Sequence, residues 1–275
     1  MIYTEAFLMG VRELEKAGIV DAKLDARFLL EEICQTGPNT LFCHGDRKVL
    51  KEEEKRYREV LALRAKHVPL QHILGYQDFM GLRFEVNEHT LIPRPDTEIL
   101  VEEVMRDLHD GMRILDLCTG SGCILLSLLH YSNDCEGVGT DISGEALTVA
   151  KRNAKALKEK AQFLQGDLYE GVTGKFDLLV SNPPYIERAV IPTLMEEVRD
   201  HDPYIALDGG EDGLDFYRRI IADAPEYLCR GGQIFLEIGS EQAEAVSELL
   251  SEAGFKDIDV HMDYSGLDRV VKAYR

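Results

Sequence analysis

Residues 113–141 read RILDLCTGSGCILLSLLHYSNDCEGVGTD, and this stretch decides the fold. It begins with a short apolar strand at 113–117 and passes through a glycine-containing turn into an apolar segment of helical character at 123–130. A second strand follows at 136–141. Two strands joined through a helix are the unit from which parallel sheets are built. The stretch therefore predicts a parallel strand pair with a crossover helix.

Strands and helices continue to alternate after residue 141. Further strands are expected at 162–164, 176–180, 233–238, 258–261 and 269–273, with helices between them, among them 214–227 and 241–253. The pattern predicts an α/β fold with a doubly wound, mostly parallel seven-stranded sheet. Residues 186–213 are long for a loop in a compact domain, which indicates a functional segment.

The first part of the chain has a different pattern. Apolar residues at helical spacing predict helices over residues 1–68, the third from about 46 to 66. Residues 79–86 and 90–92 are expected to form a hairpin that turns at 87–89. The predicted organisation is a helical domain at 1–70, which we expect to recognise the substrate, a hairpin linker at 71–96 and a catalytic domain at 97–275.

Acidic residues follow three successive strands. Asp116 ends the first, Asp141 ends the second and Asp167 follows the third. In doubly wound sheets, ligands bind at the carboxyl ends of the strands. A carboxylate such as Asp141 can accept hydrogen bonds from both hydroxyls of a ribose. Gly166, Asp167 and Leu168 are well placed to bind an adenine ring through its amino group and an apolar contact.

The turn after the first strand lacks the G-x-G-x-x-G motif of dinucleotide-binding sites. It has only Gly120 and Gly122, and Asp116 would repel a phosphate. A cationic cofactor with a sulfonium group fits better, which indicates S-adenosylmethionine. The expected cofactor-binding residues are Arg94, Asp116, Cys118, Thr119, Gly120, Ser121, Gly122, Asp141, Ile142, Asp167, Leu168 and Asn182.

Asn182, Pro183, Pro184 and Tyr185 follow the fourth strand. The prolines stiffen the segment and provide no backbone donor. The Asn182 side-chain oxygen and the carbonyl groups are hydrogen-bond acceptors, and Tyr185 offers a flat face. These four expected catalytic residues suit a planar NH2 group, either of an amide or of an aromatic amine.

Composition narrows the class of protein. The net charge of −19 argues against nucleic-acid binding, because phosphate contacts need clustered Lys and Arg. The six cysteines show no C-x-x-C spacing, which predicts free thiols in a reducing compartment. The sequence shows no spacing typical of metal ligands, so no metal site is expected. The first residues lack a signal-peptide pattern, and no apolar run reaches roughly 18–20 residues. We therefore expect no signal peptide, no membrane segment and a cytoplasmic location.

Several segments together resemble a known family. They are residues 69–75, 91–98, 116–122, 181–186, 206–213 and 237–239. With these motifs the chain resembles the protein-(glutamine-N5) methyltransferases that act on peptide chain release factors. The resemblance implies the class I S-adenosylmethionine-dependent methyltransferase fold and, as substrate, the glutamine of the Gly-Gly-Gln motif. One departure is Cys118, which stands where the family more often has a glycine; we expect its backbone to have an ordinary negative φ.

The resemblance also assigns roles. Asn182 Oδ1 and the Pro183 carbonyl would each accept one N–H of the glutamine amide, Tyr185 would pack on the amide plane, and no residue stands out as a general base. Arg94 would either roof the cofactor pocket or pair with a core carboxylate. Three alternatives stay open: a glutamine of a ribosomal protein as substrate, adenine-N6 methylation of nucleic acid, and a non-catalytic binding module.

Overall fold

The computed structural model describes residues 1–275, which divide into two units. The first unit comprises Met1–Gly75 together with Met195–His201, and the second comprises Tyr76–Leu194 and Asp202–Arg275. A short segment of the long loop thus belongs to the helical unit. The buried apolar side chains of each unit pack within that unit, and each unit is described by itself.

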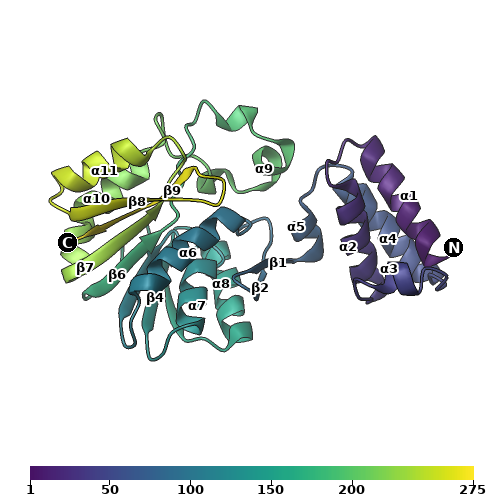
Figure 1. Ribbon diagram of the computed structural model, residues 1–275, viewed down its shortest axis with the longest axis horizontal. Helices are drawn as coiled ribbons and strands as arrows, with labels where there is room; N and C mark the ends of the chain where they lie inside the picture. Colours follow the sequence, from purple (N-terminus) through teal and green to yellow (C-terminus); the bar gives the residue numbers. More distant parts are fainter. The chain divides into compact units, whose positions relative to one another are not determined.

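The first unit is a helical bundle (Figure 1). Its helices are α1 (Tyr3–Lys16), α2 (Ala22–Cys34), α3 (Thr40–Cys43), α4 (Lys51–Arg64), α5 (Leu70–Leu74) and α9 (Glu196–His201). Gly10 of α1 permits close helix packing, because a Cβ atom there would lie 2.0 Å from the Tyr57 hydroxyl. That hydroxyl donates to the Ala26 carbonyl of α2 at 2.9 Å. The buried Arg64 Nε donates to Asp25 at 2.7 Å, and Arg64 Nη2 donates to Glu197 of α9.

The second unit contains a seven-stranded sheet of order β5-β4-β3-β6-β7-β9-β8. Its strands are β3 (Arg113–Leu117), β4 (Glu136–Asp141), β5 (Ala161–Gln165), β6 (Phe176–Ser181), β7 (Leu228–Glu237), β8 (Lys256–Met262) and β9 (Asp268–Tyr274). All neighbours are parallel except β9, which runs antiparallel to both β7 and β8. The mostly parallel, doubly wound seven-stranded sheet that the sequence predicted is confirmed.

Helices cover both faces of the sheet (Figure 1). Alternate residues of one strand, such as Ile114 and Leu115, enter separate cores on the two faces. One core is formed with α6 (Pro95–Asp107), α7 (Cys123–His130) and α8 (Gly144–Leu157), the other with α10 (Asp215–Tyr227) and α11 (Ala243–Glu252). Burial on both faces explains why the strands read as apolar runs.

The hairpin before the sheet differs from the prediction. Strands β1 (Tyr76–Phe79) and β2 (Leu82–Glu85) pair antiparallel, and Met80 and Gly81 form the turn, both with positive φ. The predicted turn at 87–89 was therefore wrong. The apolar residues Phe79 and Phe84 misled the prediction, because they lie on opposite strands and pack edge to face across the hairpin.

Candidate functional site

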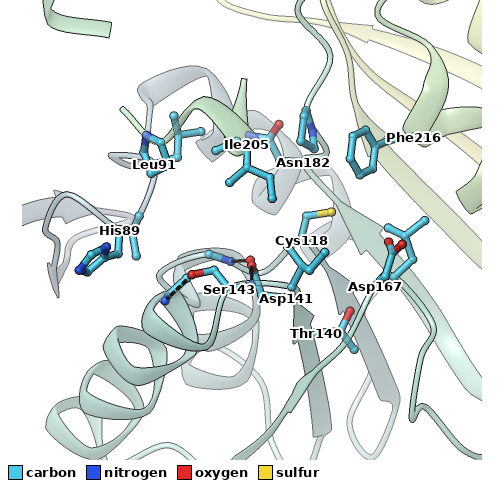
Figure 2. Close-up of a pocket in the computed structure, with 18 of the residues that line it drawn as sticks. His89, Leu91, Cys118, Thr140, Asp141, Ser143, Asp167, Asn182, Ile205 and Phe216 are labelled. Carbon is cyan, nitrogen blue, oxygen red and sulfur yellow. Dashed lines mark hydrogen bonds between the residues drawn. The ribbon is translucent and has the colours of Figure 1, made fainter. Parts of the chain in front are cut away.

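A pocket opens at the carboxyl ends of the parallel strands (Figure 2). The space within it, including the part open to solvent, is about 860 Å³. Strand order reverses between β3 and β6, because β4 and β5 lie on one side of β3 and β6 on the other. Ligands of doubly wound sheets bind at such a point. Its lining residues are His89, Thr90, Leu91, Cys118, Gly120, Thr140, Asp141, Ile142, Ser143, Ala146, Gly166, Asp167, Leu168, Asn182, Pro184, Pro203, Ile205, Ala206, Phe216 and Arg219.

The turn from β3 to α7 is built from left-handed backbone. Cys118, Gly120 and Gly122 have φ of 60°, 55° and 79°. The expectation of a negative φ at Cys118 was therefore wrong: the chain needs the left-handed conformation here to leave the strand, and the cysteine adopts it despite its Cβ atom. Cys118 and Gly120 line the pocket, so the turn places both backbone and a thiol against a ligand.

Asp141, at the end of the neighbouring strand β4, fixes this turn by a direct hydrogen bond. Its Oδ2 accepts the Gly120 N–H at 2.8 Å and its Oδ1 accepts the Ser143 N–H at 2.9 Å. Burial raises the pKa of the Asp141 carboxyl, and these backbone donors oppose that rise. Ser143 in turn caps α8 by accepting the Ala146 N–H at 3.1 Å (Figure 2). A carboxylate with remaining lone pairs therefore faces the pocket at a fixed position.

Asp116 lies behind the turn and does not line the pocket. Its side chain is fully buried, and the Thr119 hydroxyl donates to its Oδ2 at 2.6 Å. Burial raises the pKa of Asp116 to about 7, with the Thr119 hydrogen bond opposing. Thr119, Ser121 and Gly122 of the turn are buried as well, so in this structure these four predicted residues form or support the turn and do not line the pocket.

Asp167 lies on the side of the pocket opposite His89 (Figure 2), and Leu168 lines the pocket too. Leu168 is buried with a φ of 53°, which turns the chain back after β5. Arg219 of α10 donates to Asp167 Oδ2 at 2.7 Å, and Phe216 from the preceding turn of α10 completes the wall. A half-exposed ion pair beside an aromatic ring thus forms one end of the pocket.

The Asn182–Tyr185 segment leaves β6 at the centre of this edge. Ser181 anchors it by donating to the Leu117 carbonyl at 2.7 Å, and Asn182 Nδ2 donates to Thr97 Oγ1 at 3.2 Å. Asn182 and Pro184 line the pocket, whereas Pro183 and Tyr185 do not. The Tyr185 carbonyl accepts a hydrogen bond from Gln242 at 3.0 Å. The hydrogen bond to Thr97 engages the amide nitrogen of Asn182, so its Oδ1 remains available as an acceptor.

Arg94 pairs with a buried carboxylate. Its Nη2 donates to Asp202 Oδ2 at 2.5 Å, and the Asp202 side chain is fully buried. Arg94 does not itself line the pocket, but the segments on either side of the ion pair, 89–91 and 203–206, both do. The pair therefore ties two walls of the pocket together.

More than half of the residues that line the pocket were not predicted from the sequence. The lining residues that the sequence analysis did not place in the site are His89, Thr90, Leu91, Thr140, Ser143, Ala146, Pro203, Ile205, Ala206, Phe216 and Arg219. Residues 89–91 and 203–206 have no periodicity that would assign them to a wall. The available signal was the length of the 186–213 loop, together with the predicted motif at 91–98.

The pocket fits S-adenosylmethionine. It has a carboxylate at the end of β4, apolar groups in Ile142, Leu168 and Phe216, and left-handed backbone that approaches a ligand closely. No group of three or more His, Cys, Asp or Glu side chains is arranged to hold a metal ion. No helix is long and apolar enough to cross a membrane.

Comparisons with known proteins agree with this geometry. Residues 5–75 match the family model of the PrmC N-terminal domain, and residues 95–199 match the methyltransferase small domain. The chain is 42% identical over 259 residues to the release factor glutamine methyltransferase of Geobacter sulfurreducens, covering 94% of this chain and 91% of that protein. It is 41% identical to the one of Moorella thermoacetica, covering 100% and 99%.

Solved structures share the fold. A methyltransferase from Pyrococcus furiosus superimposes with a TM-score of 0.56 at 19% identity, over 71% of this chain and 90% of that one. This likeness supports the architecture, while the relatives above establish the family. The chain belongs to the release factor glutamine methyltransferases, enzymes of the S-adenosylmethionine-dependent class I fold.

Proposed function

We propose that this protein transfers the methyl group of S-adenosylmethionine to the side-chain amide nitrogen of the glutamine in the Gly-Gly-Gln motif of a peptide chain release factor. The observation that carries the proposal is the state of Asn182. Its Nδ2 is engaged by Thr97, so its oxygen is the group available to a substrate NH2 at the pocket.

A primary amide needs such a site because it is a weak nucleophile. Its lone pair is delocalised into the carbonyl group, the same resonance that gives peptide bonds a rotation barrier of about 18–20 kcal/mol. Asn182 Oδ1 and the Pro183 carbonyl would accept the two N–H groups and hold the nitrogen in one orientation. Both oxygens also stabilise the positive charge that develops on the nitrogen.

The remaining residues position and shield the reaction. The cofactor, when bound, supplies an electrophilic methyl group on a sulfonium. Asp141, Asp167 and Leu168 would hold its nucleoside, and Cys118 and Gly120 would lie along it. The rigid Pro184 and the ring of Tyr185 would exclude water from the amide. The surplus proton would then leave the nitrogen to water.

Incubation with methyl-labelled cofactor tests the proposal. The candidate substrates are a release factor, its Gly-Gly-Gln variant with Gln→Ala, a ribosomal protein and DNA. We expect label on the release factor only, and none on the Gln→Ala variant. Label on DNA or on the ribosomal protein instead, or label that survives the Gln→Ala change, would refute the assignment.

A variant of the protein tests the site. Asn182→Ala removes the acceptor, so we expect turnover to fall by about 10²- to 10³-fold, as for the loss of one preorganised polar group in other enzymes. Cofactor affinity, measured by calorimetry, should change little. Near wild-type turnover would remove Asn182 from the proposed role.

A further inference from the structure

Behind Asn182 lies a buried carboxylate that the reaction described above does not use. Glu237, at the end of β7, is 1% exposed and its Oε2 atom forms no hydrogen bond within the protein. It does not line the pocket. The side chains of Thr97 and Asn182 hydrogen-bond the Glu237 carboxylate, and Arg269 of β9 attracts it electrostatically. Burying a carboxylate away from water costs free energy, so the position of Glu237 needs a physical explanation.

The direction of the hydrogen bonds among Glu237, Thr97 and Asn182 explains why a carboxylate is placed there. An ionised carboxylate can only accept, so a Thr97 hydroxyl next to it donates to Glu237. The Thr97 oxygen is then left to accept, and Asn182 Nδ2 donates to it at 3.2 Å. The Asn182 amide is thereby forced to turn its nitrogen inward and its oxygen outward.

Without an acceptor-only group, the relay could reverse. A neutral partner that donates to Thr97 would free the hydroxyl to donate to Asn182 Oδ1. The amide would then rotate by half a turn and present its NH2 to the pocket. A substrate NH2 cannot be held by another NH2, so the site would lose the acceptor on which it depends.

We propose that Glu237 is a positioning residue, which fixes the orientation of the Asn182 amide, both directly and through Thr97, so that Oδ1 faces the substrate. The inference rests on the proposed function, since it concerns the same amide-binding site. Three elements supply the three residues: Thr97 comes from α6, Asn182 follows β6 and Glu237 ends β7.

The charge of Glu237 gives the inference a pH dependence. Burial raises the pKa of Glu237 to about 7, while Thr97, Arg269 and Asn182 lower it and Asp96 raises it further. Tyr185, whose pKa burial raises to about 12, is neutral beside it, and Arg269 stays charged. Protonated Glu237 becomes a donor, so the amide loses its fixed orientation as the pH falls below about 7.

The first measurement is the pH profile of kcat for wild-type protein on a release factor. We expect kcat to fall as the pH drops from about 8 to about 6, with a midpoint near the pKa of Glu237, about 7. A flat profile over this range would overturn the inference. The measurement uses wild-type protein, so it does not depend on the folding of a variant.

The second measurement is Glu237→Gln, which keeps the shape and supplies a donor. We expect roughly a 10- to 100-fold lower kcat, the usual size of a coupling within a hydrogen-bond network. The low-pH decline should disappear, and the cofactor dissociation constant should stay within about twofold, which also shows that the variant is folded. Thr97→Ser keeps the hydroxyl relay and should retain most of the activity.

A matched control is Glu103→Gln, which neutralises another buried carboxylate of the same unit, paired with Arg106 and His261. We expect it to keep both kcat and the pH profile. If Glu237→Gln has wild-type kcat and profile while the wild type methylates the release factor, only the inference falls. If the wild type does not methylate the release factor, the proposed function falls and the inference with it.

Discussion

Gly209 lies directly against the backbone of Tyr185, and a Cβ atom at Gly209 would be 2.7 Å from the Tyr185 Cα and 2.8 Å from its carbonyl carbon. The contact is continued by two backbone hydrogen bonds. Ile186 N–H donates to the Leu207 carbonyl at 3.0 Å, and Gly209 N–H donates to the Ile186 carbonyl at 2.8 Å. The end of the long loop thus packs against the Asn182–Tyr185 segment where the segment leaves β6.

We expect Gly209→Ala to displace this segment, because the obstructing atoms are backbone and cannot rotate away. Overpacking of this kind costs about 1–3 kcal/mol, and turnover should fall more than cofactor affinity. Urea unfolding and methyl-transfer kinetics measure the two effects. Gly37→Ala is the control, since nothing lies within 4 Å of a Cβ atom there. Wild-type turnover in Gly209→Ala would show that the contact does not position the segment.

Cys118 predicts a second effect, through backbone conformation. Its φ of 60° is unfavourable for a side chain with a Cβ atom, and most unfavourable for a β-branched one. Cys118→Gly should leave the free energy of unfolding within about 1 kcal/mol, because relief of strain offsets the greater entropy of the unfolded glycine. Cys118→Val should cost roughly 1–3 kcal/mol.

Urea unfolding of the two Cys118 variants tests this, with calorimetry of cofactor binding beside it. Since the cysteine lines the pocket, Cys118→Val should also weaken the cofactor. Equal stability of the valine and glycine variants would contradict the left-handed conformation.

The Arg94–Asp202 ion pair should stabilise two walls of the pocket. Arg94→Ala leaves the fully buried Asp202 side chain without this partner. Complete loss of a buried pair costs about 3–5 kcal/mol, and the partial exposure of Arg94 reduces our expectation to about 1–3 kcal/mol. The KM for the cofactor should rise as segment 203–206 loosens.

Arg152→Ala is the matched control for this pair. Arg152 pairs with Glu85 on the surface, where both side chains are nearly half exposed. Its removal should change the free energy of unfolding by less than about 1 kcal/mol. Equal losses in Arg94→Ala and Arg152→Ala would show that burial of Asp202 does not matter.

The raised pKa of Glu237 predicts how stability depends on pH. Its ordinary value is 4.5 and its folded value is about 7, so between these values the folded protein holds a proton that the unfolded chain has released. Rising pH in this window therefore lowers the stability contributed by this group, and the loss is complete above about pH 7.

Glu237→Gln removes this penalty. We expect the variant to gain stability relative to wild type as the pH rises from about 5 to about 8, by on the order of 1–3 kcal/mol, while its activity falls. Urea unfolding at several pH values measures the difference. A difference that is constant with pH would contradict a buried Glu237 that titrates in this range.

Much of the fold was readable in the sequence. The apolar runs and the helices between them predicted the doubly wound sheet, because strands buried on both faces must be apolar throughout. Asp141 and Asp167 were predicted at strand ends, and both line the pocket, since parallel strands end at one edge. The resemblance in its motifs then identified the family.

Other features depend on the tertiary structure. The left-handed backbone at Cys118 follows from how β3 must turn into α7, which overrides the preference of the residue. The turn of the β1–β2 hairpin was misplaced because its two phenylalanines pack across strands rather than along one. The 89–91 and 203–206 walls meet at the pocket although more than a hundred residues separate them.

The sequence by itself determined the layered sheet, the family and the identity of the Asn182–Tyr185 segment, because local periodicity and contiguous motifs encode them. Only the tertiary structure brought Thr97, Asn182 and Glu237 together. Their meeting depends on the packing of α6 over the ends of β6 and β7, and the charge state and orientation of a buried polar group are set by such neighbours in space.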